Sequence, residues 1–329
     1  MSDRRNKLAF AIFALVAAGF FSGSSYAETS LPLTTQTGPY AVTMEMDPTL
    51  PDHTIFRPRD LSKVSAPLPV IAFGNGGCAN VGNTHQQLLA EIASHGYIVV
   101  AGGPIDPALA RGGAVTFGGG QDTTAQMIKT LDWATSEAGS RGSPYFGKIA
   151  TDKFAVSGQS CGGLQAIAAG ADPRVKTVVI LNSGIIRGRL GGPGPARPPA
   201  AAPAGGPPGG PPRVVGGPPQ KMMMPATEAD LAKLHTPLIY LTGGPTDIAY
   251  AGAEGDFKAI NGLPIFDAST DKGHGGTWFQ LDGGFMAKPV VAWLDWQLKG
   301  DTAASKQFLG ADCGLCTDPR WTVKKKNLP

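Results

Sequence analysis

The sequence predicts one α/β domain, with a mostly parallel central sheet of about eight strands and helices on both faces. Short β-branched runs alternate with helix-like segments along the chain, which is the pattern of an α/β fold. Most of these runs are continuously apolar, as expected for strands covered on both faces. The chain also holds 46 Gly and 29 Pro residues, which excludes coiled coils and long helical bundles.

Six segments are predicted as strands of the parallel part of the sheet. They are residues 69–73, 97–101, 154–157, 175–181, 238–241 and 263–266. Upstream, residues 40–46 alternate apolar and polar side chains, and residues 53–57 have an extended pattern. These two segments predict an antiparallel start to the sheet.

Four helices are expected between and after these strands, each with its own start or stop signal. They are an apolar stripe at 88–93 before Gly96, a stripe at 127–134 capped by Asp122, a segment opened by the capping pair Thr227 and Asp230, and a stripe at 290–298 ending at Gly300.

The N-terminus has the pattern of a secretory signal peptide. Basic residues at 4, 5 and 7 precede an apolar run over 8–21, and Ser25-Tyr26-Ala27 resembles an A-x-A cleavage site. We expect residues 1–27 to be removed, which places the remaining domain, residues 28–329, in the periplasm or outside the cell. The alternative is an uncleaved signal anchor. No other run is long enough to span a membrane.

The charge balance argues against a nucleic-acid partner. The formal net charge is +3, and removing the signal segment would leave a nearly neutral chain. The one basic run, Lys324 to Lys326, is expected to be a solvated tail. Export would place the four cysteines in an oxidising compartment, where three pairings are open to them.

Residues 191–219 form a biased segment with 9 Gly and 11 Pro among 29 positions. Such a composition cannot bury enough apolar surface to offset the entropy cost of ordering. We expect a disordered or polyproline-like insertion. It would be either a tolerated surface loop or a flap over a site, and the sequence leaves both open.

The chemistry centres on Gly158-Gln159-Ser160-Cys161-Gly162, which matches G-x-S-x-G. This motif requires a strand before the serine and a helix after it, because the tight turn lifts the hydroxyl clear of the backbone. A predicted strand precedes the motif, and residues 161–169 follow it as a helix of small side chains. Ser160 is therefore the candidate nucleophile.

A serine nucleophile needs a histidine base and an acid, which follow it in the order Ser, acid, His in this type of fold. Of the five histidines only His274 lies beyond a suitable acid in a glycine-flanked loop. Asp247 is the candidate acid because it follows the end of a strand, and Asp256 is its rival.

The backbone N–H groups of Cys161 and of Gly77 are the candidate oxyanion-hole donors, with Gly76 as the alternative to Gly77. Cys78 and Cys161 would then flank the hole and form either a disulfide or two buried thiols. Cys313 and Cys316 would make the other pair. A single CxxC without a nearby histidine argues against a metal site, and no cofactor is expected.

The motifs GQSCGG, GNGGC, TGGPTDIA and GHGG together resemble those of the α/β-hydrolase superfamily over residues 40–301. The segment order is most similar to the compact branch with dienelactone-hydrolase-like, platelet-activating-factor-acetylhydrolase-like and cutinase-like polyester hydrolases. The resemblance implies an eight-stranded sheet with Ser160 as nucleophile, Asp247 as acid and His274 as base. GNGGC lacks the His-Gly start common in that branch.

These features lead us to expect an exported serine esterase that forms an acyl-enzyme on a small or polymeric ester. Tyr250, Trp278 and Phe279 lie beside the acid and the base and are candidates for the substrate pocket, with core packing as the alternative role. The alternatives are a peptidase of the same fold and a catalytically silent protein that docks partners through its Pro-rich loop. The sequence does not indicate an oligomeric state.

Overall fold

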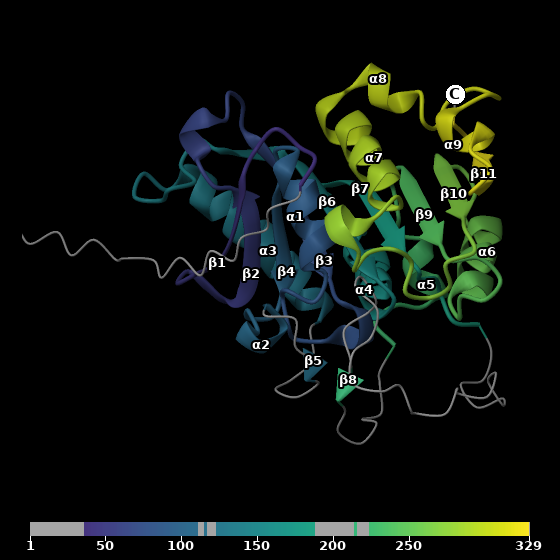
Figure 1. The fold of residues 1–329 in the computed structure, drawn as a ribbon, viewed down its shortest axis with the longest axis horizontal. Helices are drawn as coiled ribbons and strands as arrows, with labels where there is room; N and C mark the ends of the chain where they lie inside the picture. The colour runs from purple at the N-terminus through teal and green to yellow at the C-terminus, as the bar shows by residue number, and fades with distance from the viewer. Residues whose placement is uncertain (1–35, 111–114, 117–122, 188–213, 216–223, 329) are drawn as a thin grey trace, which may run out of the picture.

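Nine strands of the described residues form one central sheet in the order β1-β2-β4-β3-β6-β7-β9-β10-β11 (Figure 1). The computed structural model describes residues 36–110, 115–116, 123–187, 214–215 and 224–328. The predicted signal peptide and most of the predicted insertion lie outside the described residues. The strands of the sheet are β1 (Val42–Asp47), β2 (Leu50–Pro58), β3 (Leu68–Gly74), β4 (Ile98–Gly102), β6 (Ile149–Gln159), β7 (Val175–Leu181), β9 (Leu238–Thr242), β10 (Ile265–Ser269) and β11 (Thr322–Lys326).

The sheet is mostly parallel, which confirms the predicted α/β class. All neighbours from β4 through β3, β6, β7 and β9 to β10 pair in parallel. β1 pairs antiparallel with β2, and β2 pairs antiparallel with β4, as the alternating N-terminal pattern predicted. The antiparallel strand β11 closes the opposite edge.

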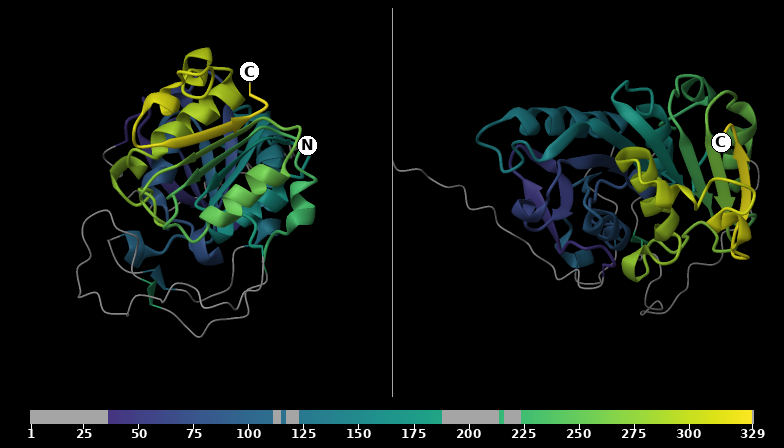
Figure 2. Two further views of the ribbon diagram at one scale, coloured as in Figure 1. Left: turned by 90° about the vertical axis from the view of Figure 1, so that its right-hand side faces the viewer. Right: turned by 90° about the horizontal axis from the view of Figure 1, so that it is seen from above.

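The helices cover both faces of the sheet (Figures 1 and 2). The side chains of β3 show why, because alternate residues of a strand point to opposite faces. Ile71 and Phe73 pack into the apolar layer formed with α1 and α7. Val70 and Ala72 pack into the layer formed with α3 and α4. The helices are α1 (Gln86–Ser94), α2 (Pro107–Ala110), α3 (Thr124–Gly139), α4 (Cys161–Ala169), α5 (Glu228–Leu231), α6 (Tyr250–Ala259), α7 (Ala287–Lys299), α8 (Thr302–Ser305) and α9 (Gly314–Thr317).

The capping residues of α5 and α7 are the predicted ones, and that of α3 is a different residue. α7 ends at Gly300, which has a left-handed φ of 71°. Thr227 and Asp230 form the predicted capping box of α5. For α3 the cap is Thr123, paired with Gln126 in a capping box, whereas the proposed cap Asp122 lies outside the described residues. The cap of α5 could be predicted because its two residues lie three positions apart, and the end of α7 because one glycine marks it.

The C-terminal lysines are not a solvated tail, so that prediction was wrong. Lys324 to Lys326 lie in β11, which continues the sheet beside β10. Lys324 pairs with Glu254, and the ammonium of Lys326 donates to the carbonyl of Ile260 at 2.8 Å. The lysine side chains of this edge strand thus bind neighbouring carboxylates and carbonyls. A run of three lysines in the sequence does not predict these contacts.

A second, two-stranded sheet joins β5 (Val115–Thr116) and β8 (Val214–Val215) in parallel. β8 belongs to the segment over 191–219 that was expected to lack regular structure. At this point the predicted insertion therefore pairs with the chain that precedes α3 (Figure 1).

Candidate active site

Ser160, Asp247 and His274 meet at the carboxyl ends of the parallel strands. Ser160 follows β6, Asp247 lies in the loop after β9, and His274 lies in the loop after β10. Nε2 of His274 lies 2.9 Å from Oγ of Ser160, and its Nδ1 lies 2.6 Å from Oδ1 of Asp247. Both distances are within hydrogen-bond range. The imidazole therefore bridges a hydroxyl and a carboxylate.

The position of this cluster follows from the order of the strands. The chain runs from β3 outward to β4 and later returns to β6 on the other side of β3. The loops after β3 and β6 therefore leave in opposite directions, as they do at the topological switch point of an α/β sheet. Gly74 of β3 pairs with Gly158 of β6 beside it. Ser160 thus stands where an α/β sheet ordinarily binds its ligand.

Ser160 sits in a tight turn between β6 and α4. Its φ of 55° lies in the left-handed region, which is uncommon for a residue with a side chain. The backbone is held on both sides, since its N–H donates to the carbonyl of Leu181 at 2.9 Å and its carbonyl accepts from Ser183 Oγ at 2.6 Å. A Cβ at Gly162 would collide with the carbonyl of Gly74, so this turn packs directly against the end of β3.

Asp247 is buried and fully engaged in hydrogen bonds. Its Oδ2 accepts from the backbone N–H of Gly243 at 3.0 Å and from Asn182 Nδ2 at 2.6 Å. Its Oδ1 accepts from the N–H of Ala249 at 2.9 Å and faces His274. Burial alone would raise the pKa of this carboxyl, but the hydrogen bonds outweigh burial and hold its pKa below the ordinary value. Asp247 therefore remains a carboxylate at neutral pH.

The loop that carries His274 is held by two buried amide side chains. Asn182 Nδ2 donates to the carbonyl of Gly273 at 3.0 Å, and Gln159 Nε2 donates to the carbonyl of His274 at 3.0 Å. The N–H of Gly273 also donates to the carbonyl of Gly243 at 2.9 Å. The loop of His274 is thus anchored to β6, to the end of β7 and to the loop of Asp247.

The loop after β3 contains the other candidate oxyanion donor. Residues Gly76–Cys78 form a short 3-10 turn in which Gly77 has φ 64°, a conformation that glycine adopts without steric cost. Cys161 is the first residue of α4, so its N–H has no acceptor within the helix. Cys78 and Cys161 form a disulfide with Cα atoms 5.2 Å apart. This bond joins the glycine loop directly to the residue after Ser160.

The second cysteine pair is also at disulfide distance. Cys313 and Cys316 have Cα atoms 4.9 Å apart.

Of the two alternatives for Cys78 and Cys161, a disulfide or two buried thiols, the structure has the disulfide. Two disulfides are consistent with a protein of an oxidising compartment.

Of the two roles open to Trp278, substrate contact and core packing, its side chain has the core-packing one. Its side chain is fully buried in the core, and its Nε1 donates to Asn182 Oδ1 at 2.5 Å. The buried indole therefore holds the amide of Asn182, which in turn donates a hydrogen bond to Asp247. Phe279 is half-buried and its ring lies 4.9 Å from that of His85. Tyr250 is half-buried at the start of α6, with its ring centroid 6.0 Å from Lys324 Nζ.

The rival acid Asp256 has a different set of partners. Its carboxylate pairs with Arg187 at 2.7 Å and accepts from the N–H of Ile185 at 2.9 Å and from Tyr240 at 3.2 Å. These contacts fix the chain where it leaves β7. Of the two candidate acids, the structure brings Asp247 to His274.

Three residues of the site were missing from the sequence interpretation: Gln159, Asn182 and Ser183. Each lies within two residues of a strand's carboxyl end, since Gln159 ends β6 and Asn182 and Ser183 follow β7. That placement was the available signal, because polar residues at these ends converge in a parallel sheet. Their partners lie 23 to 115 positions away, which a linear pattern does not show.

His85 is a further imidazole close to the site, packed between Phe73 and Phe279 with ring centroids 5.3 Å and 4.9 Å away. Complete burial lowers its pKa to about 3, so the ring is neutral. Within the described part of the chain, no three of His, Cys, Asp and Glu gather as a metal site would require. No helix of that part is long and apolar enough to cross a membrane.

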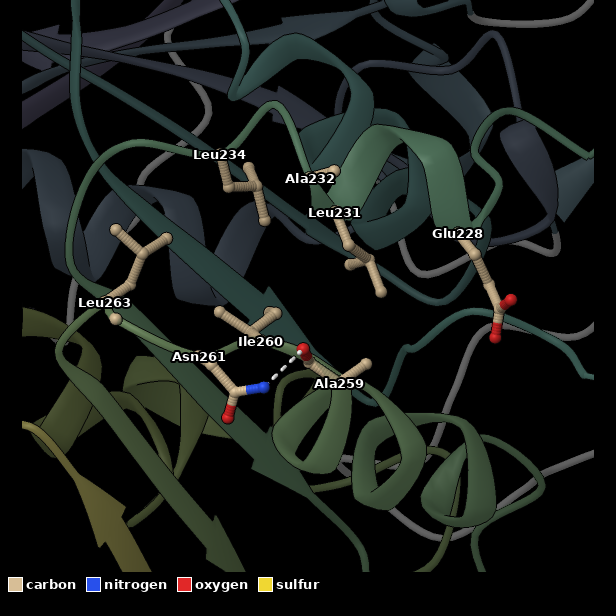
Figure 3. Close-up of a pocket in the computed structure, with 9 residues that line it drawn as sticks. Glu228, Leu231, Ala232, Leu234, Ala259, Ile260, Asn261 and Leu263 are labelled. Carbon is tan, nitrogen blue, oxygen red and sulfur yellow. Dashed lines mark hydrogen bonds between the residues drawn. The ribbon is translucent and has the colours of Figure 1, made fainter.

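A separate surface pocket of about 470 Å³ lies between α5 and the chain that follows α6 (Figure 3). Leu231, Leu234, Ile260 and Leu263 contribute most of its apolar wall. The residues that line it do not belong to the cluster around Ser160. The pocket is therefore a feature distinct from the candidate site.

A comparison with profiles of known protein families found no match, and a search among curated proteins found none either. The chemistry of the site is therefore inferred from its own geometry.

Proposed function

We propose that this chain is an exported serine hydrolase of the α/β-hydrolase type that cleaves carboxylic esters. The observation that carries the proposal is the hydrogen-bonded chain from Ser160 Oγ through the His274 imidazole to the buried carboxylate of Asp247. Its geometry is that of a nucleophile, a base and an orienting acid. The strand, tight turn and helix around Ser160 support the same fold type.

In the proposed reaction Ser160 Oγ attacks the ester carbonyl while His274 Nε2 takes the hydroxyl proton. Asp247 holds the imidazole in the tautomer with hydrogen on Nδ1 and stabilises the imidazolium that forms. The tetrahedral oxyanion accepts hydrogen bonds from the N–H groups of Cys161 and Gly77. Loss of one such donor ordinarily lowers kcat by about 10²- to 10³-fold.

Collapse of the tetrahedral intermediate breaks the bond to the alcohol oxygen, which leaves with the proton from His274. The acyl group remains on Ser160. Water then attacks this acyl-enzyme with His274 again as base, and the carboxylic acid is released as the Ser160 hydroxyl regains its proton. No step of this cycle requires a metal or an organic cofactor.

Export is part of the proposal. It is supported by the two disulfides and by the sequence pattern of residues 1–27. N-terminal sequencing of the protein recovered from the secreting host tests it, with a new N-terminus after Ala27 as the expected result.

Ester turnover by the purified protein tests the function directly. We expect hydrolysis of p-nitrophenyl esters by the wild type and a loss of about 10⁶-fold in kcat for Ser160→Ala. Ser62→Ala is the control and should keep full activity, because Ser62 lies in an exposed turn that contributes no residue to the cluster around Ser160. A panel of acyl chain lengths with a solid polyester and a peptide substrate separates an esterase from a peptidase. A folded protein without turnover of any of these substrates would favour the binding-protein alternative.

A further inference from the structure

Asn182 is the first residue after β7, and its side chain is completely buried between the acid loop and the base loop. Its Nδ2 donates to Asp247 Oδ2 at 2.6 Å and to the carbonyl of Gly273 at 3.0 Å. Its Oδ1 accepts from Trp278 Nε1 at 2.5 Å. Both amide hydrogens and the amide oxygen are therefore in use.

The three partners determine which way the amide of Asn182 faces. The Asp247 carboxylate and the Gly273 carbonyl only accept hydrogen bonds, and the indole N–H of Trp278 only donates. A rotated amide would place its oxygen against two acceptors and its NH₂ group against a donor. The site therefore selects asparagine by polarity as well as by shape.

The backbone of Asn182 is equally constrained. Its φ of 44° lies in the left-handed region, which asparagine tolerates better than most residues with a side chain. Its N–H donates to the carbonyl of Leu241 in the neighbouring strand β9 at 2.8 Å. The amide thus projects from a fixed point of the sheet.

Gln159 makes the corresponding contact from the adjacent strand. It lies in register with Leu181, the residue before Asn182, and its Nε2 donates to the carbonyl of His274. Two consecutive carbonyls of the base loop, those of Gly273 and His274, are therefore held by amides from two neighbouring strands. Only Asn182 also contacts the acid.

We propose that Asn182 is a positioning residue that holds the acid Asp247 and the loop of the base His274 in one relative arrangement. The proposal rests on the proposed ester hydrolysis, in which these two groups act on Ser160. Asn182 does not touch the reacting atoms and acts through its two hydrogen-bond acceptors. A displacement of about 1 Å in such a cluster ordinarily costs about 10²-fold in rate.

Two variants test this role without straining the backbone. Asn182→Asp keeps the shape but turns a donor toward Asp247 into a second acceptor. Asn182→Gly removes the amide and tolerates the positive φ. We expect both to lower kcat by about 10- to 100-fold with KM within about twofold of the wild type. A residue that only packs would affect stability and leave kcat in place.

Asn83→Asp is the matched control. Asn83 is also fully buried, and its amide donates to the carbonyl of Asp106 at 3.0 Å and accepts from the N–H of Asp106 at 2.9 Å. This variant reverses the polarity of a buried amide outside the triad. It should lower the melting temperature and keep kcat within about twofold of the wild type.

A proton NMR spectrum supplies a second readout that needs no substrate. The hydrogen that His274 Nδ1 shares with Asp247 should give a far-downfield resonance in the wild type and in Asn83→Asp, and a shifted or missing one in both Asn182 variants. If the wild type hydrolyses esters, unchanged kcat in the folded Asn182 variants overturns the proposal. If the wild type proves inactive, the proposed function fails, and an unchanged resonance in the variants still overturns the role of Asn182.

Discussion

Nδ1 of His274 lies 2.6 Å from Oδ1 of Asp247, although 27 positions of the chain separate the two residues. The contact exists because β9 and β10 pair in parallel, so the loops that follow them leave the sheet side by side. The N–H of Gly273 donates to the carbonyl of Gly243 and ties the two loops together. The pairing of β9 with β10 thus brings the proposed acid and the proposed base together.

Asp247→Asn tests the choice of acid. It should lower kcat by about 10⁴-fold, because an amide at this position stabilises the wrong imidazole tautomer and no longer stabilises the imidazolium. Asp256→Asn is the matched change at the rival carboxyl. It should leave kcat unchanged and lower the free energy of unfolding by about 1 to 3 kcal/mol, because Arg187 loses its buried charged partner and keeps only the exposed Glu228. Steady-state kinetics and urea unfolding of both variants check this, and the reverse pattern would make Asp256 the acid.

Asp267 should make the protein less stable as the pH rises toward neutrality. Burial raises the pKa of this carboxyl to about 7, Lys324 opposes the rise and Glu254 adds to it. An unfolded aspartate ionises near pH 3.9, so between about pH 4 and 7 the unfolded chain binds fewer protons than the folded one. The free energy of unfolding therefore falls across this window.

Asp267→Asn removes this titration and should stabilise the protein increasingly from pH 4 to 7, by up to about 4 kcal/mol at the upper end. Urea unfolding of both proteins at pH 5 and pH 8 measures the difference, and the other titrating groups cancel in the comparison. An equal difference at the two pH values would contradict the raised pKa.

Gly162→Ala tests the close contact between the turn of Ser160 and the loop after β3. A Cβ at Gly162 would collide with the carbonyl of Gly74, so the two segments must separate. We expect a loss of about 2 kcal/mol or more in stability, as in other overpacked sites, together with a lower kcat. Gly139→Ala in α3 is the control, since a Cβ there meets no atom within 4 Å. That variant should be neutral or more stable by up to about 1 kcal/mol, and equal effects at both glycines would refute the contact.

The disulfide between Cys78 and Cys161 should appear as a cross-linked peptide in mass spectrometry of the non-reduced protein. It closes a long loop, since the two cysteines lie 83 positions apart in the sequence. Replacing both by alanine should therefore lower the free energy of unfolding by about 4 kcal/mol. The backbone N–H of residue 161 remains, so activity at low temperature should persist. Recovery of Cys78 as a free thiol would contradict this pairing.

Local patterns predicted much of the fold. The predicted strands at 69–73 and 175–181 correspond to β3 and β7 within one residue at each end, because continuous apolar runs between turn residues carry that information. β11 was missed, since its three lysines resemble a polar tail until Glu254 and the end of α6 are placed beside them.

Parts of the candidate site could be predicted from the sequence. Ser160 has its strand and its helix within a few positions, and His274 is the one histidine that lies beyond a suitable acid in a glycine-flanked loop. Asn182 and the burial of Trp278 depend on contacts across the sheet at 65 to 96 positions of separation. Such contacts have no signature in a single sequence. The oxyanion-hole roles of Cys161 and Gly77 and the substrate-binding role of Tyr250 stay predictions, as do the catalytic roles of the triad.

Labelling with a fluorophosphonate probe tests the central claim most directly, because only a serine activated by a base reacts with it. We predict one covalent adduct on the peptide that contains Ser160 in the folded wild type, and none in His274→Ala under the same conditions. A folded wild type that carries no adduct on Ser160 would contradict the proposed nucleophile and with it the hydrolase.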